Sequence, residues 1–178
     1  MLRLLSGDDQ MLRHVARMIG PKITKAQHRL ISKVHKTLLA IPGALAIAAP
    51  QVGIDLRFFV ALRTASEAVT VINPRVTWTS LDEIDDFFVD PQGNPIARQS
   101  PAWEGCLSFP KMEFLVVRPN IIKVEFLTDK GVTKTTSLNG FDARLFLHEL
   151  DHLDGIMVDS KCQSSRQMDE AEEDRMSM

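Results

Sequence analysis

The chain has 178 residues and a formal net charge of −2, with 44% hydrophobic and 25% charged residues. These values are ordinary for a folded globular protein and argue against a disordered chain. No apolar run approaches the roughly 18 residues of a membrane span. The first residues, MLRLLSGDDQMLR, turn polar and acidic too soon for a signal peptide. We therefore expect a cytoplasmic protein that makes no use of a membrane.

The charges are unevenly distributed along the chain. Residues 1–42 carry eight Lys or Arg against two Asp, whereas residues 80–100 and the C-terminal end are acidic. Basic residues on exposed helix faces are usually just solvated, and a weak contact with RNA or the ribosome is the alternative. We expect no specific nucleic-acid partner.

Two helices are predicted near the N-terminus. The spacing of apolar residues in 8–19 suits a short amphipathic helix. A second helix should begin at Thr24, because Thr24 and Gln27 form a capping-box pattern. It should continue to Ile41 and stop at Pro42-Gly43.

Strands are predicted in the middle of the chain. Segments rich in β-branched and aromatic residues occur at 57–62, 69–72, 75–78, 114–117, 120–127 and 132–138. Residues 128–131 are typical of a hairpin turn. Between the third and fourth strands, residues 80–101 predict a long acidic surface loop, with a turn of helix near Phe87-Phe88. A loop of this length is usually functional or mobile.

A third helix is predicted from Gly140 to a C-terminal cap at Gly155. Its apolar residues lie on nearly all sides, which is typical of a buried helix. His148 and His152 are four residues apart, so both imidazoles can reach one metal ion, with Glu149 beside it. Two surface histidines are the alternative, but polar groups on a buried helix need a metal or hydrogen-bond partners.

The third metal ligand decides the chemistry of such a motif. One protease continuation requires a histidine where this chain has Val158, and another requires a glutamate that only the polar tail could supply. An HExxH zinc endopeptidase is therefore the weaker alternative. Cys106 is the better candidate, although a lone cysteine is usually a small buried hydrophobe. One thiolate and two imidazoles suit ferrous iron, zinc, cobalt or nickel and leave a fourth position open.

Three segments carry a resemblance to a known family. AIAAPQVG at 46–53, EGCLSFP at 104–110 and HELDHLDG at 148–155 resemble, in order and spacing, the signature motifs of the peptide deformylases. The resemblance covers roughly residues 8–160. It implies one catalytic domain over 1–160 with a flexible polar tail at 161–178. It also implies an α+β fold, with antiparallel sheets packed around a central buried helix that carries the HExxH motif and with N-terminal helices.

The resemblance implies a metal-dependent amide hydrolase that acts on a formyl group rather than on a peptide bond. In this family the cysteine and the two histidines bind one divalent metal, commonly ferrous iron; here they are Cys106, His148 and His152. Glu149 matches the general base and acid. The side-chain amide of Gln51 and the backbone N–H of Leu107 match the groups that stabilise the oxyanion.

The implied substrates are nascent polypeptides that begin with N-formylmethionine. The residues expected around the methionine and the peptide backbone are Leu45, Ala46, Ile47, Gly105, Arg144 and Leu145. Ala46 stands where the family usually has glycine, and its methyl group could crowd the peptide. Glu104 and Arg118 match a pair that ties the cysteine loop to its neighbouring strand. Asp151 is expected either to orient a ligand histidine or to be an ordinary hydrogen-bonded helix residue.

Two further expectations concern partners. Bacterial members often dock on the ribosome through a C-terminal helix, for which the short acidic tail of this chain is poorly suited. A non-catalytic metal-binding or ribosome-associated relative is the remaining alternative. Such a relative should have lost Gln51, Glu149 or a metal ligand, and this chain retains all of them.

Overall fold

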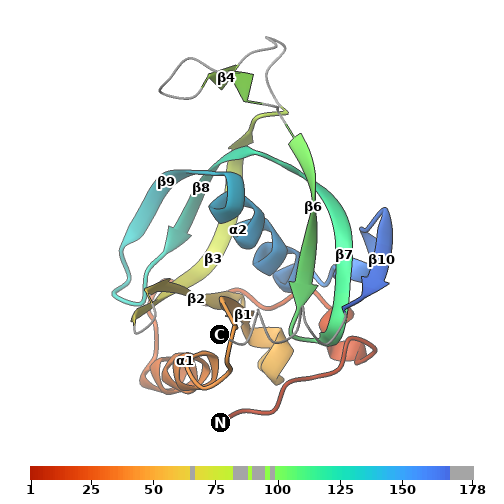
Figure 1. Ribbon diagram of the computed structural model, residues 1–178. Coiled ribbons are helices and arrows are strands. Elements are labelled where there is room, and N and C mark those ends of the chain that lie inside the picture. The colour runs from red at the N-terminus through yellow and green to blue at the C-terminus, as the bar shows by residue number, and fades with distance from the viewer. Residues whose placement is uncertain (65–66, 82–87, 90–94, 97–98, 169–178) are drawn as a thin grey trace.

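The computed structural model describes residues 1–64, 67–81, 88–89, 95–96 and 99–168. The fold is α+β, and every strand pair is antiparallel (Figure 1). Among the described residues, no helix is long and apolar enough to span a bilayer. Most of the expected acidic loop at 80–101 lies outside the described residues, so its role remains a prediction.

The larger sheet has five strands in the order β1-β2-β3-β8-β9. They are β1 (Ala46–Ala48), β2 (Phe58–Thr64), β3 (Glu67–Thr79), β8 (Ile121–Leu127) and β9 (Thr133–Asn139). The strands predicted at 69–72 and 75–78 are both parts of β3. The register shifts between Ile72 and Arg75, where Asn73 has a φ of 49°. In the sequence, Asn73-Pro74 at this irregularity looks like a break between two strands.

The smaller sheet has three strands in the order β10-β7-β6. They are β6 (Gln99–Cys106), β7 (Phe109–Pro119) and β10 (Ser164–Gln167). β6 was not predicted, because its prolines and acidic neighbours favoured a loop. β10 pairs with β7 although residues 161–178 were expected to form a flexible tail.

A separate pair consists of β4 (Phe88–Val89) and β5 (Pro95–Ile96). The predicted turn of helix near Phe87-Phe88 is therefore wrong at Phe88, which begins a strand. Phe87 lies outside the described residues.

The predicted helix at 8–19 is replaced by one 3₁₀ turn, η1 (Gln10–Arg13), followed by extended chain. The reason is tertiary. The backbone N–H of Ala16 donates to the carbonyl of Leu153, and that of Ile19 donates to the Asn73 side chain. These bonds use donors that a helix would need for itself.

The second predicted helix is confirmed as α1 (Lys25–Leu38). Thr24 is its N-cap and forms the capping box with Gln27. The helix ends three residues before Ile41, the predicted end. Its buried side includes Ile31, Val34 and Leu38.

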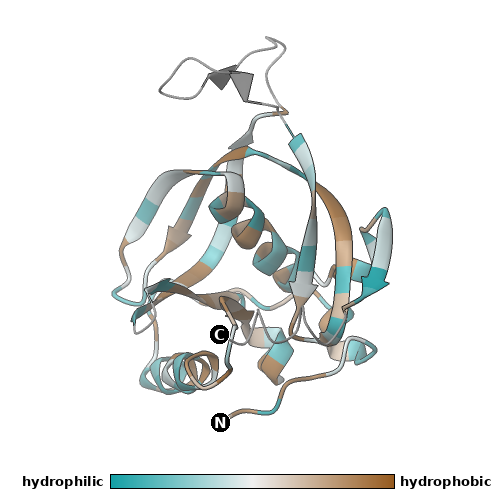
Figure 2. Ribbon diagram, viewed as in Figure 1, coloured by the Kyte–Doolittle hydropathy of each residue, from teal (hydrophilic) through white to brown (hydrophobic). Residues whose placement is uncertain are grey.

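The third predicted helix is α2 (Gly140–Leu153). It ends in a Schellman motif, since the N–H groups of Gly155 and Ile156 donate to the carbonyls of His152 and Asp151, 3.4 and 2.9 Å away. Figure 2 shows both hydrophobic and hydrophilic residues along α2. The helix contacts strands of both sheets, including β1, β7 and β9.

At β2 the five-stranded sheet is buried on both faces, with successive side chains pointing to opposite sides. Phe58 and Val60 of β2 join a core cluster with Val34 of α1. Phe59, between them in sequence, joins a second cluster with Phe146 of α2. The rings of Phe59 and Phe146 pack edge to face at 5.3 Å. This double layer fixes α2, and with it His148 and His152, relative to the sheet.

The end of α2 gives a stability prediction. Gly155 and Gly131 both have positive φ, 70° and 75°. A Cβ at Gly155 would lie 2.8 Å from the backbone of Arg13, whereas one at Gly131 would meet nothing within 4 Å. Gly131→Ala should cost about 1 kcal/mol of unfolding free energy, and Gly155→Ala about 1–3 kcal/mol more. Urea unfolding of the metal-free variants measures both, and equal losses would contradict the prediction.

Candidate active site

A pocket of about 600 Å³ opens between the two sheets. β1 is the outer strand of the five-stranded sheet and β6 the outer strand of the three-stranded sheet, and residues of both line the pocket. Residues at the start of α2 complete the wall, including Phe141 and Leu145. The pocket therefore lies between two strand edges and one helix.

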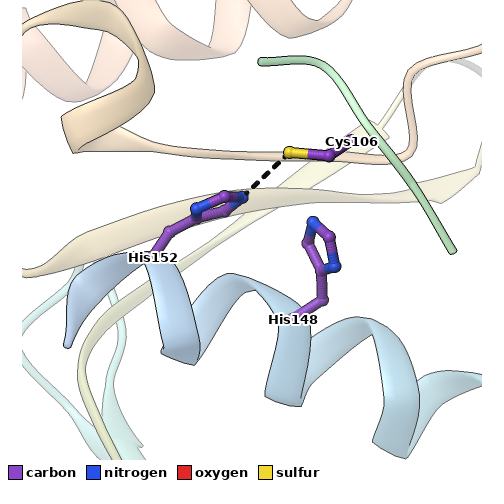
Figure 3. Close-up of side chains that lie close together, drawn as sticks. All are labelled: Cys106, His148 and His152. Atoms are coloured by element: carbon purple, nitrogen blue, oxygen red, sulfur yellow. Dashed lines mark hydrogen bonds between the residues drawn. The ribbon is translucent and has the colours of Figure 1, made fainter. Parts of the chain in front are cut away.

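Cys106, His148 and His152 lie close together, and the first two also line the pocket (Figure 3). The sulfur of Cys106 and the Nε2 atom of His152 are 3.4 Å apart. One ligand atom from each residue can be chosen so that all three lie within 4.8 Å of one another. Cys106 is the last residue of β6, and both histidines come from α2.

These three residues fit a metal ion. The Nδ1–H of His148 donates to Glu104 at 2.9 Å, which leaves its Nε2 as the available ligand atom. His152 directs its Nε2 toward Cys106, while its Nδ1 has no partner in the described part of the chain. Two imidazoles and a thiolate suit zinc, ferrous iron and related ions. The predicted ligand set is therefore assembled in space, across forty-two residues of sequence.

Glu104 joins the site to a buried ionic network. Arg118 of β7 donates Nε and Nη2 to the two carboxylate oxygens of Glu104, at 2.6 and 2.8 Å. Arg144 donates to the same carboxylate at 2.7 Å. Burial alone would raise the pKa of Glu104, but Arg118 and His148 outweigh it and lower the pKa to about 2. The carboxylate is therefore held ionised as the acceptor for His148.

Asp151 extends this network toward the C-terminal segment. It accepts from Arg118 at 2.7 Å and from Lys161 at 2.6 Å. Within the described residues its side chain has no hydrogen bond to His148 or His152; Arg118 and Glu104 connect it to His148. Lys161, which follows η3 (Val158–Ser160), was not singled out from the sequence, because nothing in its local pattern points to a buried partner.

Glu149 lies beside the ligands with 3% of its surface exposed. Its Oε2 has no hydrogen-bond partner among the described residues. Burial raises the pKa of Glu149 to about 7, although His148 and Arg118 act in the opposite direction. An unsatisfied buried carboxylate oxygen in a pocket is suited to exchange a proton with a bound molecule.

The imidazole of His148 lies among negative groups. Burial alone would lower the pKa of His148, but Cys106 and Glu104 raise it to about 10. Burial lowers the pKa of His152 well below its ordinary value. Positive charge is thus favoured at the side of the cluster nearest Glu104.

Gln51 approaches the cluster from η2 (Ala49–Val52), a 3₁₀ turn that directly follows β1. Its Oε1 accepts from the backbone N–H of Ala48 at 2.9 Å, so its Nε2 must face the site. That Nε2 donates to Ser108 Oγ at 3.3 Å and lies 3.7 Å from the Cys106 sulfur. A fixed amide donor therefore points at the ligand cluster.

Most of the predicted peptide-binding residues line the pocket. They are Leu45, Ala46, Gly105, Arg144 and Leu145, together with Leu107. Ile47 does not: it is fully buried in the core against α1. Alternation along β1 points it away from the pocket.

Two of the predicted residues have partners that their sequence context did not reveal. The carbonyl of Leu45 accepts from the Leu62 N–H at 2.8 Å, so this oxygen is engaged within the sheet. The head group of Arg144 donates to Glu104 and to the carbonyls of Val116 and Ser100, at 2.7, 2.9 and 2.6 Å.

Several pocket residues were missed at the sequence level. Trp103 and Phe141 line the pocket with 39% and 62% of their surface exposed. Both are aromatic residues close to a signature motif, at 104–110 and 148–155, and this proximity could have indicated a place in the pocket. Met168 also lines the pocket, because β10 brings the C-terminal segment to β7. No local pattern could have indicated that contact.

Known proteins resemble this chain over nearly its whole length. The family model of polypeptide deformylase matches residues 1–168. The peptide deformylase of Thermotoga neapolitana is 32% identical over 169 residues, which cover 94% of this chain and 91% of the relative.

Solved structures agree with this similarity. The crystal structure of the Thermotoga maritima peptide deformylase matches with a TM-score of 0.73 and 31% identity, covering 92% of this chain and 99% of that chain. A class I type b peptide deformylase from Acinetobacter baumannii, bound to Met-Ala-Ser, matches with a TM-score of 0.73 and 26% identity, covering 90% and 97%. From its sequence, its fold and the residues gathered in its pocket, this chain belongs to the peptide deformylase family of enzymes.

Proposed function

We propose that this chain removes the formyl group from the N-formylmethionine of nascent polypeptides by metal-dependent hydrolysis. The observation that carries the proposal is the cluster of Cys106, His148 and His152 next to a pocket that Cys106, His148 and the buried carboxylate of Glu149 line. An HExxH endopeptidase would need a different third ligand, and a non-catalytic relative would not need Glu149 or Gln51. The family match favours the deformylase over both.

Cys106, His148 and His152 are the residues that would hold one divalent metal, with ferrous iron as the first candidate and zinc, nickel or cobalt as alternatives. A divalent metal supplies two effects: it lowers the pKa of water and polarises a carbonyl group. Glu104 keeps His148 oriented for this role through its 2.9 Å hydrogen bond. α2 would then be the central helix of a deformylase fold, and one catalytic domain would extend to residue 168.

Glu149 moves the proton in this proposal. It accepts a proton from the water that attacks the formyl carbon, and it donates that proton to the methionine nitrogen as the C–N bond breaks. The products are formate and a peptide with a free amino group. Its Oε2, which lacks a partner within the described residues, is the atom assigned to this transfer.

Gln51 and Leu107 stabilise the oxygen of the formyl group when it becomes an oxyanion. The Nε2 of Gln51 already faces the cluster, because Ala48 holds the other end of the amide. The backbone N–H of Leu107, next to Cys106, is the second donor. Such donors act most strongly in a buried site that is arranged in advance.

The peptide is proposed to lie extended between β1 and β6, since both strands are the outer members of their sheets. An outer strand offers unpaired backbone groups to an added strand. The methionine side chain would contact Leu145 and the stem of Arg144. The methyl group of Ala46 borders this path and should favour peptides with a small second residue.

The partner surface is proposed to be α1. Residues 10–54 contain no Asp or Glu. Four exposed cations of α1 repeat at helical spacing and form one basic face, and the exposed Lys22 precedes the helix; the four are Lys25, Arg29, Lys33 and Lys36. None of the five has an ion-pair partner in the described ranges of the chain, unlike Arg13 and Arg17. This face suits the phosphate backbone of ribosomal RNA in the cytoplasm, where nascent chains begin.

The role of Glu149 can be tested by Glu149→Gln. This variant should retain the metal and lose at least about a hundredfold in kcat, because the amide cannot accept a proton. Deformylation of formyl-Met-Ala-Ser and metal analysis after anaerobic purification provide the measurements. Glu125→Gln, a matched change on distant β8, should behave as wild type. Equal turnover by wild type and Glu149→Gln would disprove the mechanism, and casein cleavage without deformylation would favour the endopeptidase.

The role of Glu104 predicts a change in metal affinity. Glu104→Gln should weaken metal binding by about 10- to 100-fold, because His148 loses its ionised acceptor. Competition with a chelator measures this affinity. An unchanged affinity would mean that the Glu104–His148 bond does not support the metal site.

The basic face predicts salt-dependent binding to ribosomes. Lys25→Gln/Lys33→Gln should weaken binding by roughly tenfold at low salt and flatten the salt dependence by about two phosphate contacts. Deformylation of free tripeptides should not change. The control Arg63→Gln/Arg75→Gln removes the same charge from cations already paired with Glu67 and Glu125. If both double variants bind equally, α1 is not the docking surface.

A further inference from the structure

The first residues of the chain form a strap across the catalytic segments. We define the N-terminal strap as residues 2–7. Its backbone N–H groups donate to three separate elements: Leu2 to the Thr37 hydroxyl at 2.9 Å, Leu5 to the carbonyl of Gln51 at 2.8 Å, and Gly7 to the carbonyl of Ser108 at 2.8 Å. The strap thus joins α1, η2 and the turn between β6 and β7.

Two of these acceptors belong to the segments that carry the proposed oxyanion donors. Gln51 supplies its own side-chain amide, and Ser108 directly follows Leu107, whose N–H is the second donor. The segments come from different sheets, because η2 follows β1 while the turn joins β6 to β7. Their separation therefore decides whether the two donors face the same oxygen.

A direct link between the segments is the 3.3 Å bond from Gln51 Nε2 to Ser108 Oγ. This is the same donor that the proposed reaction directs at the oxyanion. The bonds of Leu5 and Gly7 use only main-chain groups, so they do not depend on the direction of the Gln51 side chain.

Gly7 is required at this place for space rather than for backbone conformation. Its φ is not positive. A Cβ at Gly7 would lie well within 3.0 Å of three ring atoms of Phe109. The ring of Phe109 packs against Phe114 at 5.3 Å and also lines the pocket. A side chain at Gly7 therefore has to displace this ring or the strap itself.

We infer that Leu5 and Gly7 are positioning residues for the reaction: the N-terminal strap holds the Gln51 segment against the Cys106–Ser108 turn, so that the two oxyanion donors converge. The inference rests on the proposed function, because it assigns the strap a role in that same site. Leu4, between the donors Leu2 and Leu5, lines the pocket and packs against the first core cluster. The packing of Leu4 therefore adds to the hydrogen bonds that hold the strap in place.

The first test is Gly7→Ala in the metal-loaded protein. A displacement near 1 Å can cost about a hundredfold in rate, so kcat for formyl-Met-Ala-Ser should fall about 10- to 100-fold. KM should change less than about twofold, and metal content should not change. Gly20→Ala is the matched control, since a Cβ there would meet nothing within 4 Å; it should equal wild type.

A double-mutant cycle separates positioning from general destabilisation. Gln51→Ala removes the side chain through which the strap acts, so adding Gly7→Ala to it should lower kcat much less than in wild type. Phe109→Leu in the Gly7→Ala background should recover part of kcat by restoring space. Should Gly7→Ala fail to fold, Leu5→Pro provides the second test, because it removes the N–H that binds Gln51 without adding a group next to Phe109, and it should give the same pattern.

The outcomes are distinct. Wild type without deformylase activity would refute the proposed function itself. An active wild type with an unchanged kcat in Gly7→Ala, or in Leu5→Pro where Gly7→Ala does not fold, would overturn the positioning role. So would a strap effect that is equally large with and without Gln51, or a loss of kcat that merely follows a loss of metal.

Discussion

The structure depends most on the buried carboxylate of Glu104. An ionised group so far from water is stable only when it is fully paired, and Glu104 is paired by Arg118, Arg144 and His148. These partners come from β7 and α2, while Glu104 comes from β6. One desolvated charge therefore requires three elements to be in register, and Cys106 follows Glu104 by two residues on the same strand. The pairing of Glu104 therefore affects both the stability of the fold and the position of the candidate metal ligands.

The sheets have a second consequence for function. Because β1 and β6 are outer strands, each has one edge without a partner strand among the described residues. Such edges invite association with other chains, and here both face a pocket where a peptide can occupy them. Away from these edges, α1 covers one face of the larger sheet at β2 and α2 covers the other. Catalytic residues thus lie where the fold leaves backbone groups available.

Local sequence patterns predicted the elements that are stabilised locally. The capping box of Thr24 and Gln27 and the glycine cap at Gly155 satisfy helix ends within a few residues, so both helices appeared near their predicted bounds. Residues 8–19 failed as a helix because their N–H groups bond to Leu153 and Asn73. β10 was missed because it is held by distant segments, chiefly through its pairing with β7. Contacts between distant segments leave no periodicity in the sequence.

The sequence by itself supplied the residues of the proposed chemistry: a Cys and two His for one metal, Glu149 for the proton and Gln51 for the oxyanion, each inside a motif short enough to recognise. Only the tertiary structure decided how these groups are held. It excluded Ile47 from the pocket, turned Asp151 toward Arg118 and Lys161, and placed the N-terminal strap across Gln51 and Ser108. The physical reason is that residue type sets what a group can bind, whereas burial and long-range hydrogen bonds set which partner it meets.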